Sequence, residues 1–159
     1  MRVAGPRIAI ELPVGWEAEI YQPLREHVAP GAGPVPDVVL QQAPIVLHAA
    51  NFPLPQGRSD FGHDVIAMMG LMQVFVALVE YGPGDASKAL FAAEGVPDLQ
   101  PDDVSPGAIV GPMVSQAAVQ RFFHVGDRAF SLYAVVGSER MRSRLVPAIK
   151  EVLRGIAFS

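Results

Sequence analysis

The sequence of 159 residues contains no cysteine, and only 18% of its residues are charged. Without cysteine, the chain cannot form disulfide bonds, thiolate nucleophiles or zinc sites built on thiolates. The low charged fraction, beside a hydrophobic fraction of 50%, excludes a chain that is disordered throughout. A chain of this length is long enough to bury one hydrophobic core, so residues 1–159 are interpreted as a single domain.

Long apolar runs are missing as well. The most apolar window, residues 65–79, contains Gly70 and Gln73 and is shorter than the roughly 20 apolar residues that a membrane-spanning helix needs. The first thirteen residues, MRVAGPRIAIELP, lack the apolar core and the small-residue cleavage site of a secretory signal. We therefore predict a cytoplasmic protein that does not enter a membrane.

Histidine is scarce, so a histidine-based catalytic or metal site has few residues from which to be built. The four histidines are His27, His48, His63 and His124.

The densest group of candidate site residues lies in the stretch GRSDFGHD. There His63 supplies a base, Asp64 an orienting carboxylate and Asp60 a further oxygen atom within five residues. On a helix Asp60 and Asp64 share a face, which makes these three side chains weak candidates for a metal site. Together with Arg58 and with His48 from a separate strand, they are candidates for a small-ligand site.

The same stretch also has a purely structural interpretation. Ser59 or Asp60 is an ordinary N-cap residue, and acidic side chains in a first turn interact favourably with the helix dipole. Gly62 would then permit close packing in that first turn. The sequence leaves both interpretations open, a ligand site and the beginning of a helix.

Proline and glycine are abundant, with fifteen of each, and they cluster between the apolar segments. Two long stretches without hydrophobic periodicity, residues 22–43 and 92–116, are predicted to be loops, with a brief strand pairing of Val38–Leu40 as an option inside the first. Loops of this length are uncommon in compact domains and are often functional. Because the chain is also poor in catalytic residue types, the loops favour a role in binding a partner protein.

Hydrophobic periodicity predicts the regular elements. The predicted strands cover residues 7–12, 16–21, 44–52, 73–81, 117–124 and 128–136, and the last two form a hairpin. The predicted helices cover residues 60–70, 85–91 and 138–156. Hairpins combined with a strand that is apolar on both sides predict an α+β (mixed α/β) fold. We expect a largely antiparallel central sheet of about six strands with helices on both faces, an α-β-α sandwich.

Two stretches carry a resemblance to a known family. They are LPVGW (Leu12–Trp16), which follows an early strand, and the ending RAFSLYAVVGSERMRSRLVPAIKEVLRGIAF. In its order of elements the chain resembles the PsbP-like superfamily, which includes the photosystem II extrinsic protein and a Ran-binding relative in yeast. The middle stretch QQAPIVLHAANFPLPQGRSDFGHDVI is similar to actinobacterial members. The resemblance implies a fold and a bias toward binding proteins or metal ions, and it transfers no site residue to this chain.

Charge is distributed unevenly along the chain. Residues 1–103 carry five basic and thirteen acidic side chains, whereas residues 104–159 carry seven basic and three acidic ones. Helical spacing places Arg140, Arg144 and Arg154 opposite the apolar side of the last helix, where they form a candidate interaction surface. A net charge of −4 argues against nucleic acid as the partner.

The predicted function is therefore a non-catalytic protein-binding or adaptor module that needs no cofactor. The alternative is a protein that binds a small ligand or a divalent metal ion around residues 58–64. A homodimer formed through a sheet edge or through the apolar side of the last helix is also compatible with the sequence.

Overall fold

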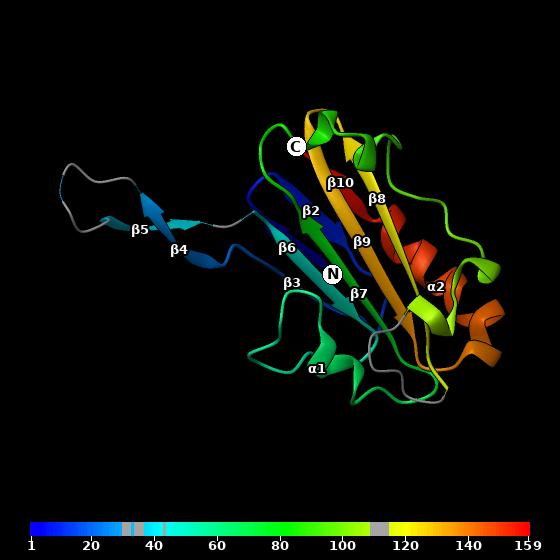
Figure 1. Ribbon diagram of the computed structural model, residues 1–159. Coiled ribbons are helices and arrows are strands. Elements are labelled where there is room, and N and C mark those ends of the chain that lie inside the picture. The colour runs from blue at the N-terminus through cyan, green and yellow to red at the C-terminus, as the bar shows by residue number, and fades with distance from the viewer. Residues whose placement is uncertain (30–32, 34–36, 43, 109–114) are drawn as a thin grey trace.

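The computed structural model describes residues 1–29, 33, 37–42, 44–108 and 115–159, and most of its regular structure is β (Figure 1). At its centre is a five-stranded antiparallel sheet with the strand order β3-β6-β7-β9-β8. Its strands are β3 (Glu17–Tyr21), β6 (Val46–Ala50), β7 (Val74–Glu80), β8 (Ala117–Val125) and β9 (Arg128–Val136). A second antiparallel sheet consists of β1 (Arg2–Gly5), β2 (Ile8–Glu11) and β10 (Ile156–Phe158).

The middle strands of the larger sheet are buried on both faces. In β7, Val74 and Val76 belong to one hydrophobic core, whereas Phe75 and Ala77 belong to the other. Since successive side chains of a strand point to opposite faces, two apolar sets predict two covered faces. The strand predicted over residues 73–81 is therefore present and buried as expected.

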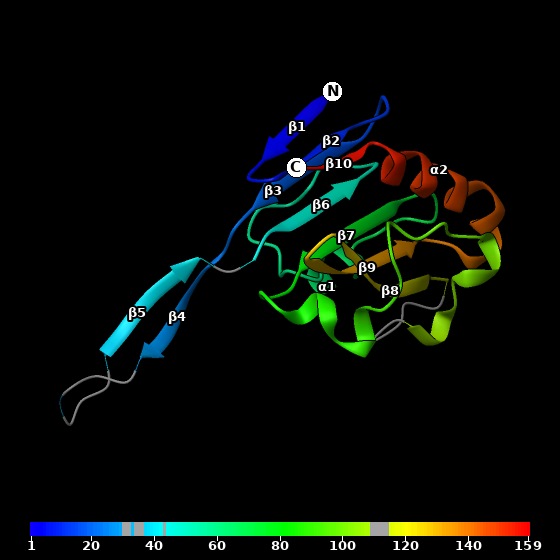
Figure 2. The ribbon, with the colours of Figure 1, turned by 90° about the horizontal axis from the view of Figure 1, so that it is seen from above.

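The two faces are covered differently. Figure 2 shows the smaller sheet and α2 (Arg142–Arg154) over one face of the five-stranded sheet. The larger core fills this space, with Ile10 of β2 and Ile149 of α2 both fully buried. The other face is covered by α1 (His63–Ile66) and its flanking loops.

The predicted α-β-α sandwich with helices on both faces is therefore wrong. The described part of the chain is mostly β, and α2 is its only helix longer than one turn of α-helix. The remaining helical pieces are single 3-10 turns: η1 (Asp85–Ser87), η2 (Ala89–Phe91), η3 (Pro101–Asp103), η4 (Pro106–Ala108) and η5 (Glu139–Met141). The helix predicted over residues 85–91 is thus two such turns, η1 and η2.

The helix predicted over residues 60–70 is limited to the four residues of α1. Its N-cap residue is Gly62, with φ = 70°, rather than Ser59 or Asp60. A Cβ on Gly62 would lie 2.3 Å from a ring carbon of Phe75, so only glycine fits this position without displacing the ring. α1 ends at the C-cap residue Ala67, and the apolar stripe that predicted a longer helix is only partly buried, with Met68 73% exposed.

The segment over residues 22–43, predicted to be a loop, contains two further strands. They are β4 (Leu24–Ala29) and β5 (Asp37–Gln42), which form a separate two-stranded antiparallel sheet. In Figures 1 and 2 this hairpin extends away from the rest of the molecule. The prolines that suggested a loop, at positions 23, 30, 34 and 36, flank these strands and do not interrupt them. We call β4 and β5 the arm.

The described part of the second predicted loop, residues 92–108 and 115–116, begins along the outer edge of β8. It makes a parallel bridge between Glu94 and His124 and an antiparallel bridge between Ser105 and Ala118. Residues 109–114 lie outside the described part of the chain.

Candidate functional site

His48 lies in the middle of β6, and its side chain is completely buried. Register places it between Glu19 of β3 and Ala77 of β7. Its ring contacts two aromatic rings, with centroid distances of 5.5 Å to Tyr21 and 5.1 Å to Phe75. A buried imidazole needs hydrogen-bond partners, and the loop that covers this face of the sheet provides them.

Arg58 reaches His48 from that loop. Its Nε donates a hydrogen bond to Nδ1 of His48 over 3.0 Å. Its two terminal nitrogens donate to the backbone carbonyl of Pro55 and to the carboxylate of Glu19. The Arg58 side chain is only 4% exposed, whereas that of Glu19 is 48% exposed. The guanidinium is therefore held from three directions by groups of the protein itself.

These contacts define the protonation of His48. Because Arg58 donates to Nδ1, this atom is an acceptor, and Nε2 carries the proton and donates to the backbone carbonyl of Asp60 over 2.8 Å. Burial is the main cause of the lowered pKa of His48. The hydrogen bond to Asp60 opposes it, and the positive charge of Arg58 adds to it. The imidazole is therefore neutral in the folded protein near neutral pH.

Tyr21 completes this arrangement from β3. Its hydroxyl donates to Oδ1 of Asp60 over 3.0 Å. Burial, followed by the hydrogen bond to Asp60, raises the pKa of Tyr21 well above its usual value, so the phenol stays protonated. We call Glu19, Tyr21, His48, Arg58 and Asp60 the His48 cluster.

The structure brings together three of the five predicted ligand-binding residues, Arg58, Asp60 and His48, and adds two that the sequence did not indicate. The polar face of the strand predicted over residues 16–21 was the only available signal for Glu19 and Tyr21. Which residues lie opposite that face, almost forty positions later, depends on the pairing of β3 with β6 and on the path of the loop.

His63 and Asp64 lie outside the cluster. Both are exposed, and the His63 ring stacks on that of Phe61 with 6.5 Å between centroids. The Asp64 carboxylate accepts hydrogen bonds from the hydroxyl and the backbone N–H of Ser59. Desolvation raises the pKa of Asp64, but these bonds and those from backbone N–H groups at the helix start outweigh it and lower the pKa.

The metal site considered for His63, Asp60 and Asp64 does not form in the described residues. No group of three or more histidine, aspartate or glutamate side chains suited to a metal ion occurs there. Asp64 instead ties Ser59 to α1, and the Ser59 hydroxyl oxygen accepts from the His63 backbone N–H over 3.2 Å. These contacts are those of a helix start.

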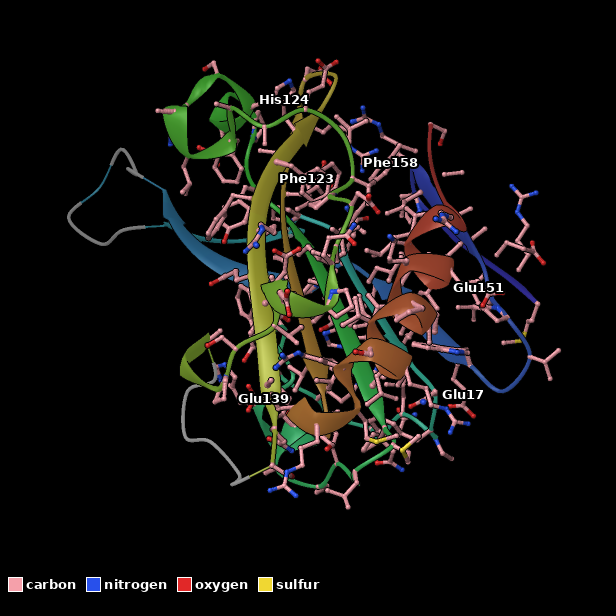
Figure 3. The ribbon with its side chains drawn as sticks, turned by 90° about the vertical axis from the view of Figure 1, so that its right-hand side faces the viewer. Glu17, Phe123, His124, Glu139, Glu151 and Phe158 are labelled. Atoms are coloured by element: carbon pink, nitrogen blue, oxygen red, sulfur yellow. The ribbon has the colours of Figure 1, made fainter. Side chains whose placement is uncertain are left out.

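The three arginines of the candidate interaction surface are exposed on η5 and α2. Arg140, Arg144 and Arg154 form no ion pair with the described residues. Glu151, exposed and turned away from the five-stranded sheet (Figure 3), lies between Arg144 and Arg154 in the helix. The surface is therefore mixed in charge and less basic than the three arginines alone suggest.

The His48 cluster works as a clamp between loop and sheet. Its charged and polar atoms contact one another and the backbone, so they anchor the loop before α1 on β3 and β6. A ligand that used Arg58 or His48 would have to break these contacts. The geometry therefore favours a structural role for this cluster over ligand binding.

Comparisons with protein-family models, with curated proteins and with solved structures each found no match. The resemblance to the PsbP-like superfamily thus stays a prediction. Within the described residues, no helix combines the length and the hydropathy that crossing a membrane requires.

Proposed function

We propose that the chain is a protein-binding module that engages its partner through the arm. The observation that supports this proposal is the pairing of β4 and β5, which within the described residues form a sheet of their own. A two-stranded hairpin is at best marginally stable in water. Its outer edges carry backbone N–H and C=O groups that an added strand can satisfy.

The fold of the domain does not require the arm. The strands on either side of it, β3 and β6, are direct antiparallel neighbours, and Tyr21 pairs with Val46. Two such strands are normally joined by a turn of about two to five residues. The chain instead inserts a ladder of six paired positions, from Leu24 opposite Gln42 to Ala29 opposite Asp37. An element that is dispensable for folding is available for a function.

The partner that fits best is a protein that adds an extended segment to one edge of the arm. In this mode backbone hydrogen bonds supply affinity, and the side chains of alternate residues supply specificity. A second copy of this chain, adding arm to arm, would use the same chemistry and give a homodimer.

The test compares the full chain with a variant in which residues 24–42 are replaced by a short Gly-Ser linker. Photo-crosslinking residues are placed at position 27 or 39, which are paired in the arm, and at position 90 of η2 as a control on the body. Light scattering of the purified chain measures self-association.

We expect one protein to be crosslinked from native lysate at positions 27 and 39, or a dimer to be crosslinked when the purified chain self-associates. Position 90 should give neither. The linker variant should unfold cooperatively and lose the partner. If the linker variant binds the same partner with unchanged affinity, the arm is not the binding element.

A further inference from the structure

A cavity of about 810 Å³ lies at the end of the five-stranded sheet where β7 and β8 end. It is bordered by the β1–β2 turn, the loop between β7 and η1, the β8–β9 turn and the beginning of β6. Its volume is in the range of small-molecule sites, about 300–1,000 Å³. Nothing in the His48 cluster contributes to it.

Arg7 is the most unusual residue at this cavity. Its φ of 59° is the only positive φ of a non-glycine residue in the described part of the chain. Pro6 and Arg7 form the two-residue turn between Gly5 and Ile8. Proline followed by a residue with positive φ is the pattern of a type II turn, whose second central position normally holds glycine. The chain keeps an arginine where the backbone favours glycine, which suggests that the side chain serves a function.

The backbone of Arg7 is held in place from two sides. Its carbonyl accepts hydrogen bonds from Nη1 of Arg128 over 2.7 Å and from the backbone N–H of Ser159 over 3.1 Å. Arg128 is itself bound to the carboxylate of Glu80 by two hydrogen bonds of 2.8 and 3.2 Å. The side chain of Arg7 thus extends from a backbone that these hydrogen bonds hold in place beside the cavity.

The charges at the cavity leave Arg7 as its available cation. Arg128 and Glu80 neutralise each other, since the buried Arg128 and the mostly buried Glu80 form an ion pair. Arg7 and Asp127 also line the cavity, are exposed, and form no ion pair with described residues. An anionic group would therefore be attracted to Arg7, and Asp127 would weaken that attraction.

The remaining lining mixes polar and apolar surface and includes one imidazole. Pro44 and Tyr81, both partly exposed, contribute apolar surface, and the Tyr81 ring packs on Phe91 with 5.0 Å between centroids. Figure 3 shows His124 beside the 3-10 turns at this end of β8. Nδ1 of His124 lies 2.6 Å from the Phe91 carbonyl, so it carries the proton. Nε2 has no hydrogen-bond partner among the described residues.

We infer that this cavity binds a small organic carboxylate, with the carboxylate paired to Arg7 and an apolar body lying against Pro44 and Tyr81. The inference does not depend on the arm, because the linker variant keeps Gln22 and Pro44, the two lining residues next to it.

The probe is phenylacetate, with uncharged phenylacetamide as its matched control, in a nuclear magnetic resonance titration of the full chain. Phenylacetate should shift the amide signals of Arg7, Gly84 and Gly126 at concentrations up to about 10 mM, ten times the Kd of a weak 1 mM site. Phenylacetamide should bind about two- to fivefold more weakly, because an ion pair to the exposed Arg7 contributes about that factor.

Three variants separate binding from folding. Arg7→Gly should bind phenylacetate about two- to fivefold more weakly, as expected for loss of an exposed ion pair. Its thermal midpoint should stay the same or rise, because glycine suits a φ of 59°. Arg7→Lys should retain most of the affinity, and Asp127→Asn should bind phenylacetate more tightly. Any of three results would overturn the inference: no shifts at these residues, equal binding of phenylacetamide, or unchanged affinity in Arg7→Gly.

Discussion

Arg58 and Arg128 are two buried arginines that hold loops against the same sheet by similar means. Their side chains are 4% and 6% exposed, and each donates to one carboxylate and one backbone carbonyl. They differ in the partner carboxylate, since Glu19 is 48% exposed and Glu80 only 14%. Water therefore screens the Arg58–Glu19 ion pair and is nearly excluded from the Arg128–Glu80 ion pair.

The surroundings of the two guanidiniums differ as well. Arg58 donates to the neutral imidazole of His48, whereas Arg128 lies over the rings of Phe130 and Phe158, at 5.1 and 5.8 Å from their centroids. The comparison teaches that removing a buried arginine costs most where its carboxylate cannot return to water.

The largest effect is expected for Arg128→Ala. This variant leaves the Glu80 carboxylate mostly buried without its partner and releases the Arg7 carbonyl. We expect a loss of about 3–5 kcal/mol in the free energy of unfolding, measured by urea denaturation. The double variant Arg128→Met with Glu80→Gln removes both charges and should lose clearly less. A double variant as unstable as Arg128→Ala would show that the unpaired charge is not the cause.

Arg58→Ala should have a smaller effect, of about 2 kcal/mol, since the half-exposed Glu19 regains water while Nδ1 of His48 loses its donor. The same urea experiment measures it. The loop before α1 should also become more accessible to protease, because Arg58 anchors it on β3. A loss greater than that of Arg128→Ala would show that exposure of the partner carboxylate does not determine the cost of removing the arginine.

The third prediction concerns pH and the imidazole next to Arg58. The pKa of His48 is lowered from 6.5 in the folded protein, so below about pH 6.5 the unfolded state binds a proton that the folded state does not. Above this pH His48 is neutral in both states, and the free energy of unfolding should not depend on its titration. It should decrease by up to about 1.4 kcal/mol per pH unit as the pH falls toward the lowered pKa.

The control for this pH dependence is His48→Gln, which keeps hydrogen-bonding groups but does not titrate. Urea denaturation from pH 7 to pH 4.5 should show a shallower pH dependence in this variant than in the unchanged chain. Identical slopes would mean that His48 is protonated equally in the folded and unfolded states.

The smallest effect is expected for Arg7→Gly, which removes an exposed arginine from the turn that Arg128 holds. Because a non-glycine residue in the left-handed region costs about 1 kcal/mol, the free energy of unfolding should stay the same or rise by up to about that amount. Thermal unfolding measures this change. A clear destabilisation would assign the Arg7 side chain a role in folding.

Some of the fold was accessible from the sequence because it depends on local patterns. The double apolar alternation of residues 73–81 indicated the buried strand β7, and the turn at Val125–Asp127 indicated the β8–β9 hairpin. The helix over residues 60–70 was predicted wrongly because helical spacing alone does not show that Met68 lies in solvent. Of the arm, only a brief pairing at Val38–Leu40 was anticipated, because the flanking prolines obscured two short strands.

The candidate site was predictable only in part. The stretch GRSDFGHD was correctly recognised as polar and near a helix start, and His48 was correctly assigned to a strand. The spacing of residues in GRSDFGHD did not predict which of its side chains point toward the sheet. Hydrogen bonds to His48 of β6 and Tyr21 of β3 hold Arg58 and Asp60 toward the sheet, whereas His63 and Asp64 are exposed at the start of α1.

The sequence by itself determined the exclusion of cysteine chemistry, the two-sided burial of β7 and the hydrophobic side of the last helix, because each depends only on composition or on the period of one element. Only the tertiary structure decided that Arg58 anchors the loop before α1 on the sheet and that Arg128 supports the turn of Arg7. It also decided that a cavity lies at the end of the sheet next to this turn. These features join residues that are far apart along the chain, and strand pairing and loop paths bring such residues together.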